Sequence, residues 1–200
     1  MSNNKDLKQL FRHCRSLNKD EQFLTEDEGM TIVGYAAVFD RTTVLWECDG
    51  VEYKEVISRG AFEGTDFKNC CLKYNHVGGA YARVRGGSLQ LETDDYGLKF
   101  TAKLLDTTDS TDLYKKIRGG LIDKCSFAFT VDEEEYDRLT HTRTVKKIGK
   151  LLDVSVVDIP AYEDTDVSAR SYFNSEEEKY RTLERETERK RAILKLKLSM

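Results

Sequence analysis

Long apolar runs, proline and paired cysteines are scarce in this sequence of 200 residues. No apolar stretch approaches the roughly 20 residues that a membrane-spanning helix needs, so we expect no membrane partner. Residues 1–5 lack the apolar segment of a secretory signal peptide, and we therefore expect the protein to stay in the cytoplasm where it is made. The single proline and the 34% of charged residues are typical of a soluble domain with charged flanks.

The cysteines are an odd number without Cys-x-x-Cys spacing: Cys14, Cys48, Cys70, Cys71 and Cys125. This pattern argues against a disulfide framework or a zinc site and favours free thiols in a reducing compartment. We expect neither a metal nor a cofactor. An excess of basic residues is also missing. The net charge is −4, whereas a nucleic-acid partner would require a concentrated basic surface, so we expect no such partner.

The composition changes along the chain and divides it into three segments. Residues 1–28 form a charged N-terminal arm, in which apolar residues at helical spacing predict one amphipathic helix: Leu7, Leu10, Phe11, Cys14 and Leu17. Residues 29–170 have the pattern of a folded domain. In residues 171–200 acidic residues lead and basic residues follow, which is the order that a helix dipole favours. We expect this charged tail to be a helix that buries little apolar surface.

Most of the segment 29–170 has the alternating pattern of β-strands. The strongest hairpin signal is the pair of alternating stretches 88–93 and 97–104 on either side of the turn at residues 94–97. Residues 110–120 have a polar cap, apolar residues four apart and two closing glycines, which predicts a short helix. Many short strands without strand–helix alternation predict a mainly β, α+β fold, built as a closed or nearly closed β-barrel edged by short helices.

One strand carries a candidate nucleophile. Residues 124–131 alternate small or polar residues with aromatic and β-branched ones, which predicts a half-buried strand. Cys125, Phe127 and Phe129 would share one face, and Ser126 would lie on the other. A serine on a rigid strand becomes a nucleophile only if a base reaches it.

The sequence offers three histidines as that base. His13 lies in the N-terminal arm, and His141 lies in a charged stretch that looks like an exposed hairpin tip. His76 follows a short strand and precedes two glycines, a loop position from which a side chain can reach into a site. A histidine is the side chain best suited to take a proton from a serine hydroxyl near neutral pH. By itself, however, such a position is far more typical of a surface or hydrogen-bonded histidine than of a catalytic base.

Six short motifs between residues 30 and 170 resemble, in this order, those of the phage prohead (capsid maturation) proteases of the HK97 type. They lie at residues 34–39, at 55–57 with 60–62, at 75–76, at 96–98, at 119–122 followed by 126–129, and at 152–157 with 160–161. The resemblance implies a serine peptidase related in fold to herpesvirus assemblin, which is a β-barrel edged by helices.

The resemblance also implies roles for individual residues. Ser126 would be the nucleophile and His76 the general base. The family pattern has a glutamate where this sequence has Asp153, which is our choice for the third residue, with His141 and Asp158 as alternatives. A cysteine peptidase using Cys125 would require that thiol, rather than Ser126, to face the histidine. For the oxyanion we expect a backbone N–H after Pro160, from Ala161 or Tyr162.

The function implied is processing of the scaffold segment of the major capsid protein, and of the protease itself, inside the immature phage prohead in the host cytoplasm. The expected partners are the capsid protein and a second copy of the chain, because the relatives suggest that self-association controls activity. The alternative is a non-enzymatic scaffold or capsid-associated protein, for which the charged C-terminal helix would suit equally well. The requirement for Ser126 and His76 in cleavage separates these two hypotheses.

Overall fold

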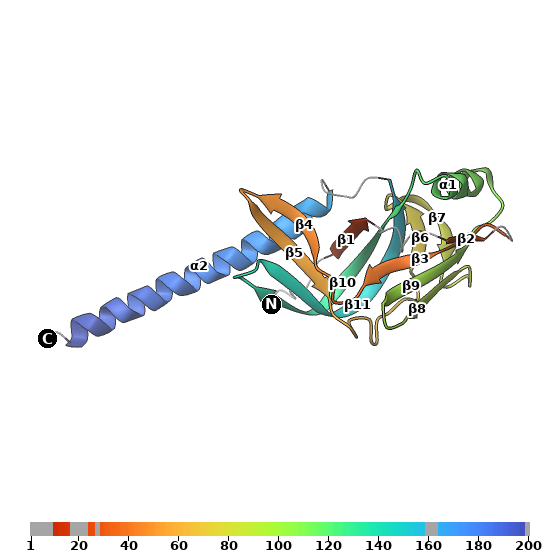
Figure 1. The fold of residues 1–200 in the computed structure, drawn as a ribbon. Coiled ribbons are helices and arrows are strands. Elements are labelled where there is room, and N and C mark those ends of the chain that lie inside the picture. The colour runs from red at the N-terminus through yellow and green to blue at the C-terminus, as the bar shows by residue number, and fades with distance from the viewer. Residues whose placement is uncertain (1–9, 17–23, 27–28, 159–163, 199–200) are drawn as a thin grey trace, which may run out of the picture.

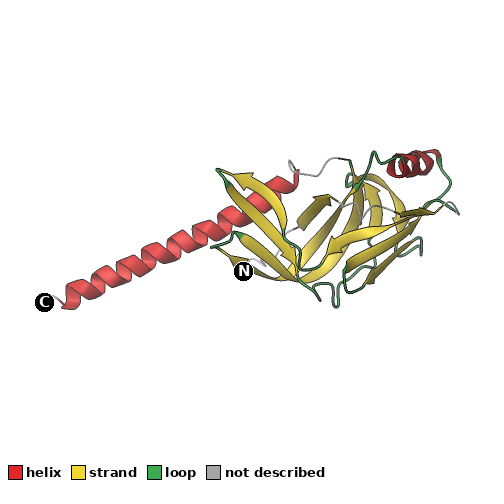
Figure 2. Cartoon of the chain, in the orientation of Figure 1, coloured by secondary structure: helices red, strands yellow, loops and turns green. Residues whose placement is uncertain are grey.

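The computed structural model describes residues 10–16, 24–26, 29–158 and 164–198, which form two β-sheets and two α-helices (Figures 1 and 2). The two sheets pack into one body, and the long C-terminal helix extends away from it (Figure 2). In the described part of the chain, no helix combines the length and the apolar character that crossing a membrane would require.

The larger sheet is built on a long antiparallel hairpin of β10 (Lys124–Asp137) and β11 (Thr142–Val157). The first half of β11 pairs in parallel with β5 (Val51–Ile57), and its second half pairs in parallel with β6 (Cys71–Tyr74). The remaining strands extend this sheet from its sides. They are β1 (Leu10–Ser16) on β10, β4 (Thr43–Cys48) on β5, and β7 (Val77–Arg83) on β6.

The smaller sheet has the order β2 (Leu24–Glu26), β3 (Thr31–Val38), β9 (Gly97–Lys103) and β8 (Leu89–Thr93), with every pair antiparallel. The predicted hairpin is present as β8 and β9. Its turn is held by Asp94, whose carboxylate accepts hydrogen bonds from the backbone N–H groups of Tyr96 and Gly97. Asp94 also accepts a 2.6 Å bond from the Tyr35 hydroxyl, which ties the turn to β3.

The mainly β, α+β class is confirmed, but the predicted barrel is wrong. Among the described strands neither sheet closes on itself, because the ends of each pairing order remain unjoined. The alternation of apolar and polar residues identifies strands, whereas closure depends on whether the outermost strands pair with each other. Whether the outermost strands pair does not change the alternation of apolar and polar residues within any one strand. An open pair of sheets and a closed barrel therefore have the same sequence pattern.

The helix predicted in the N-terminal arm is also wrong. Residues 10–16 form β1, which pairs antiparallel with β10 from Leu10 opposite Thr130 to Ser16 opposite Lys124. A stretch this short supports either structure by its apolar spacing alone, and isolated helices of such length are marginal in water. The edge of β10 offers backbone hydrogen bonds along one side of this stretch, and this tertiary contact decides the conformation. Leu7 and Leu17 lie outside the described residues.

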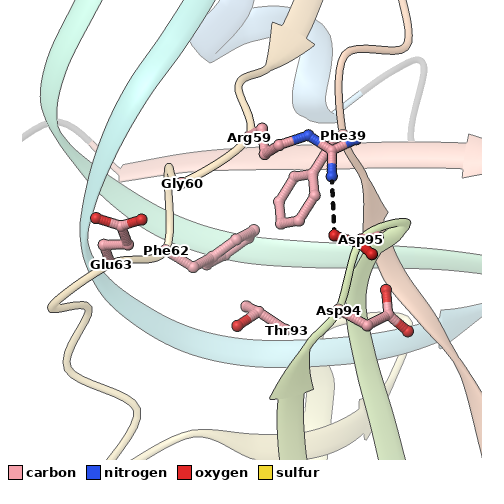
Figure 3. A pocket seen from close by; sticks show the side chains of 8 residues that line it. All are labelled: Phe39, Arg59, Gly60, Phe62, Glu63, Thr93, Asp94 and Asp95. Atoms are coloured by element: carbon pink, nitrogen blue, oxygen red, sulfur yellow. Dashed lines mark hydrogen bonds and ion pairs between the residues drawn. The ribbon is translucent and has the colours of Figure 1, made fainter.

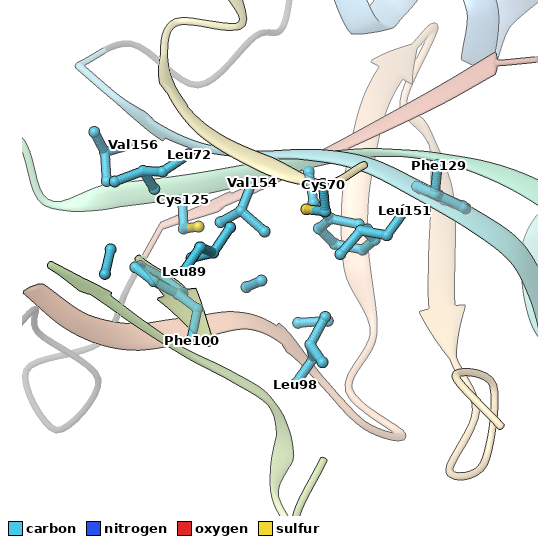
Figure 4. Packing of buried hydrophobic residues seen from close by; sticks show 14 of the residues in the cluster. Cys70, Leu72, Leu89, Leu98, Phe100, Cys125, Phe129, Leu151, Val154 and Val156 are labelled. Carbon is cyan, nitrogen blue, oxygen red and sulfur yellow. The ribbon is translucent and has the colours of Figure 1, made fainter. Parts of the chain in front are cut away.

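The hydrophobic core lies between the two sheets (Figure 4). From the smaller sheet, β9 contributes Leu98 and Phe100, both fully buried. From the larger sheet, β10 contributes Cys125 and Phe127, and several strands add further buried residues: Leu72, Phe129, Leu151, Val154 and Val156. Phe127 and Phe129 stack with their ring centroids 4.9 Å apart, a contact typical of aromatic pairs in protein cores.

The two helices differ in how they are attached. Helix α1 (Thr108–Arg118) begins at the N-cap Thr107, whose side chain accepts a hydrogen bond from the backbone N–H of Ser110. Helix α2 (Asp164–Leu198) begins before the predicted start at residue 171. It is anchored by two buried residues, Tyr172 and Phe173, which contact an aromatic group made of Trp46, Tyr53 and Tyr136. Beyond them it is mainly exposed, as the charged pattern predicts.

A buried ion cluster lies beneath this anchor. The guanidinium of Arg143, on β11, is 1% exposed and contacts the carboxylates of Glu55 and Glu134, at 2.8 Å in the case of Glu55. Its Cζ also lies 4.5 Å from the centroid of the Tyr172 ring. One cation therefore pairs with two carboxylates from different strands and also contacts α2 through a cation–π interaction.

We expect Arg143→Met to lower the free energy of unfolding by about 3–5 kcal/mol, because the variant leaves Glu55 buried without its cation. Urea unfolding followed by circular dichroism measures this loss. Arg138→Met is the matched control, since Arg138 also binds carboxylates of α2, Glu177 and Glu184, but is exposed, and solvent screens such surface pairs. Equal losses in the two variants would contradict a special role for the buried cluster.

Gly97 is required by packing rather than by its backbone angles. A Cβ atom at this position would lie 2.0 Å from the carbonyl oxygen of Ala37 on the neighbouring strand β3. We expect Gly97→Ala to lower the free energy of unfolding by about 1–3 kcal/mol, because the backbone of β3 must move. Gly86→Ala is the control, as its Cβ would have its nearest neighbour at 3.8 Å. A Gly97→Ala variant as stable as the control would contradict this packing account.

Candidate active site

The faces of the β10–β11 hairpin separate polar from apolar residues. Cys125 and Phe127 point into the core, together with Val154 and Val156 of β11. Ser126 lies on the other face, as the alternation predicts, and is directly opposite Ser155. The strand is buried on both faces at this point rather than half-buried, because Ser126 is 0% exposed.

His76 lies in the turn between β6 and β7. Tyr74 and Val77 pair across this hairpin, so Asn75 and His76 form a two-residue loop. Both have positive φ, 50° and 59°, as the type I′ turn requires. Asparagine is common at the first position of this turn, whereas glycine is preferred at the second. Here His76 occupies the second position at a conformational cost, and the turn directs its imidazole back over the sheet.

A continuous chain of hydrogen bonds joins three side chains of this site. His76 Nε2 lies 2.7 Å from Ser126 Oγ, and His76 Nδ1 lies 2.6 Å from Asp153 Oδ1. An ionised carboxylate only accepts hydrogen bonds, so Nδ1 carries the proton that it donates to Asp153. Nε2 is then free to accept the proton of the serine hydroxyl. The structure therefore brings together the three residues that sequence motifs selected, in the arrangement of a nucleophile, a base and an orienting acid.

The site is buried and its carboxylate is charged. His76 and Asp153 are each 9% exposed. Burial opposes the ionisation of Asp153, but hydrogen bonds from His76 and Ser155 and the electrostatic interactions with His76 and Lys73 outweigh it. The pKa of Asp153 consequently lies below its ordinary value, and the side chain is a carboxylate at neutral pH.

A fourth polar side chain in the site was not selected from the sequence. Ser155 is 0% exposed, and its hydroxyl donates a 2.8 Å hydrogen bond to Asp153 Oδ1. Its oxygen also lies 3.2 Å from His76 Nδ1. The only sequence signal for it is its position two residues after Asp153, which puts both side chains on one face of a strand.

The alternative residues have other partners. His141 lies at the opposite end of β11 from Asp153, where its Nδ1 is 3.1 Å from the Tyr136 hydroxyl. Asp158 accepts a 2.7 Å hydrogen bond from the Tyr74 hydroxyl, beside the turn that carries His76. The Cys125 thiol belongs to the hydrophobic core on the face away from Ser126, which disfavours a cysteine nucleophile.

The expected oxyanion donors, Ala161 and Tyr162, lie outside the described residues, as does Pro160. Within the residues that the structure describes, no group of His, Cys, Asp and Glu side chains is arranged to hold a metal ion.

A surface cavity of about 190 Å³ lies elsewhere, between the turn at residues 59–63 and the tip of the β8–β9 hairpin (Figure 3). Arg59 reaches across it to Asp95, with Nη1 and Oδ1 3.4 Å apart. None of its lining residues belongs to the hydrogen-bonded chain, so this cavity is separate from the chemical site.

We expect the turn residue Asn75 to control both stability and activity. Asn75→Ala should cost about 1 kcal/mol, because alanine is less favourable at positive φ, and should reduce the reactivity of Ser126 through displacement of His76. Asn75→Gly is the matched control, since glycine adopts this φ readily and should preserve both properties. Thermal unfolding and the rate at which a serine-directed fluorophosphate labels Ser126 measure the two effects. An Asn75→Gly variant as impaired as Asn75→Ala would show that the asparagine side chain, not the turn conformation, matters.

The model of the caudovirus prohead serine proteases matches residues 16–198, which is most of the chain. Among solved structures, the capsid assembly protease gp21 of bacteriophage T4 is 14% identical, with a TM-score of 0.49 over 76% of this chain and 98% of that one. No curated protein matches the sequence. The family match favours an enzyme over a non-enzymatic scaffold protein. The chain belongs to the caudovirus prohead serine proteases and is a serine peptidase of capsid maturation.

Proposed function

We propose that Ser126, His76 and Asp153 are the catalytic triad of this peptidase. The observation that supports this assignment is the unbroken chain of hydrogen bonds, 2.7 Å from Ser126 to His76 and 2.6 Å from His76 to Asp153. No rotation of a side chain is needed for proton transfer from the serine to the imidazole. Asp153 replaces the glutamate of the family pattern, and its shorter side chain still reaches His76 from β11.

The reaction follows from this geometry. Ser126 Oγ attacks the carbonyl carbon of the scissile peptide bond while His76 Nε2 takes the hydroxyl proton. Asp153 stabilises the imidazolium that results, and His76 then donates the proton to the leaving amine. Water, activated by His76 in the same way, attacks the acyl–enzyme ester and releases Ser126. For the oxyanion we retain the backbone N–H groups of Ala161 or Tyr162, which follow β11 in the chain.

Access to the nucleophile is restricted. Ser126 is 0% exposed, so a polypeptide substrate reaches its hydroxyl only after the covering side chains move. A closed site of this kind would protect the host's proteins until the protease is inside the assembling capsid. We propose that association with the capsid protein or with a second copy of the chain supplies the opening.

The substrate we propose is the scaffold segment of the major capsid protein inside the immature prohead, followed by the protease itself. Membership of the prohead protease family places the enzyme in capsid assembly within the infected host and among capsid proteins. For self-cleavage the C-terminal helix is a candidate target, because most of its side chains from residue 174 to residue 194 are exposed and its contacts with the sheets, as far as the described residues show, end at Glu184.

The test is a time course of intact mass for the purified chain, with and without the capsid protein that still carries its scaffold segment. We expect new fragments of both proteins with the wild type and none with Ser126→Ala. Asp153→Asn should slow cleavage by about 10⁴-fold, as the loss of the orienting carboxylate does in serine proteases. Cys125→Ala is the matched control and should retain cleavage, because this thiol lies in the core.

The outcomes separate the hypotheses. Cleavage of the capsid protein by Ser126→Ala would refute the assigned nucleophile, and loss of cleavage in a folded Cys125→Ala variant would favour a cysteine peptidase. Fragments of the chain alone, with the capsid protein left intact, would support the triad but contradict the proposed substrate. Two intact proteins in every sample would favour the non-enzymatic scaffold function.

A further inference from the structure

The hydroxyl of Ser155 is placed between the base and the acid of the proposed triad. It donates to Asp153 Oδ1 at 2.8 Å, and its oxygen is 3.2 Å from His76 Nδ1. The residue is fully buried on β11, where its nearest strand partners are Ser126 on β10 and Lys73 on β6. Burying a hydroxyl is unfavourable unless it is hydrogen-bonded, and the two side chains that this hydroxyl contacts, Asp153 and His76, both belong to the proposed triad.

The oxygen that Ser155 contacts is the one that matters for catalysis. Asp153 Oδ1 accepts the Nδ1–H of His76 and the hydroxyl of Ser155 together. Two donors converging on one oxygen fix the rotation of the carboxylate about its Cβ–Cγ bond. A carboxylate held by His76 alone could rotate and present its other oxygen, which would change the direction of the imidazole ring.

We propose that Ser155 is a positioning residue of this peptidase, which locks the Asp153 carboxylate and thereby aims His76 Nε2 at Ser126. The proposal rests on the triad assigned above and extends it to a fourth side chain. Ser155 does not reach the substrate or the nucleophile in this role and acts only through Asp153 and His76.

Removal of this hydroxyl has two consequences that can be measured separately. The carboxylate loses its second restraint, so the fraction of molecules with a correctly aimed imidazole falls. The charge on Oδ1 is also no longer shared with a hydroxyl donor, and the carboxylate stabilises a protonated imidazole more strongly. The Ser155 oxygen also accepts from His76 Nδ1 at 3.2 Å, and loss of this contact would favour the neutral imidazole instead. This contact is longer than the 2.8 Å hydrogen bond to Asp153, so its loss has the smaller effect.

Other ionisable groups near Asp153 are unchanged by this substitution. Lys73 and Cys71 on β6, and Cys70 directly before that strand, interact electrostatically with Asp153. Since they are retained in a Ser155 variant, a change in the pH dependence of activity reports on the hydroxyl itself.

The test uses diisopropyl fluorophosphate, which labels an activated serine without requiring knowledge of the natural substrate. Ser126 Oγ forms a bond to phosphorus, fluoride leaves, and the hydroxyl proton passes to His76. The rate of labelling of the full chain is measured by mass spectrometry between pH 5 and 9 for the wild type, Ser155→Ala and Ser155→Thr. Ser110→Ala is the matched control, because Ser110 is also a buried, hydrogen-bonded serine but lies on α1.

For Ser155→Ala we expect the plateau rate to fall about ten-fold, which corresponds to one charge-assisted hydrogen bond. The acidic limb of the profile should move to higher pH, because more alkaline solution is needed to free the imidazole of its proton. Ser155→Thr keeps the hydroxyl on a strand-favouring side chain and should stay within about three-fold of the wild type. Ser110→Ala should match the wild type in both respects.

The proposal is overturned if Ser155→Ala keeps the wild-type profile, or if its rate falls without any movement of the acidic limb. Should Ser155→Ala fail to fold, Ser155→Cys decides, because a thiol of similar size is a weak donor and should reproduce the shift in part. A shift in neither variant refutes the proposal. Wild-type protein that is labelled at Ser126 neither alone nor together with the capsid protein, which we propose opens the site, would instead refute the proposed triad itself.

Discussion

The site depends on the register between β10 and β11. With Ser126 opposite Ser155 and Ala128 opposite Asp153, the polar side chains of both strands lie on one face. A slip by a single residue would turn the other face of either strand toward His76, because successive side chains of a strand alternate. The parallel pairing of β6 with residues 153–156 of β11 then brings the turn that carries His76 to the same place.

The hydrophobic core holds this register. On the face opposite Ser126, the fully buried side chains of Cys125, Val154 and Val156 lie against the smaller sheet (Figure 4). Phe127, on the same face, is also fully buried. Displacing any of them into a polar, buried environment would cost the burial energy of the side chain and would leave polar groups without partners. The polar face is stable only because its members satisfy one another. The register of β10 and β11 that buries the apolar side chains is therefore also the register that aligns the proposed triad.

The sequence allowed some of these features to be predicted and concealed others for physical reasons. The side of the strand on which Ser126 lies and the β8–β9 hairpin follow from alternation, which is a local property. The pairing of β1 and the openness of the sheets depend on contacts between distant strands, which alternation does not encode. The meeting of His76 with Ser126 came from family motifs rather than from spacing, since 50 residues separate them. No motif in the sequence singles out Ser155. Its proposed role depends on the side-chain rotamer of Asp153, which the sequence does not specify.

The backbone conformation of His76 is unfavourable for a residue other than glycine, but it holds the imidazole in place. Its positive φ costs about 1–3 kcal/mol relative to a relaxed backbone, and a glycine would remove that cost. A glycine, however, has no imidazole, and a longer and more relaxed loop would hold the ring less firmly. A two-residue turn between paired strands has few accessible conformations, so the entropy of aiming the base is lost during folding rather than during the reaction. The strained turn therefore supplies a preorganised base at a cost that the packed sheet can sustain.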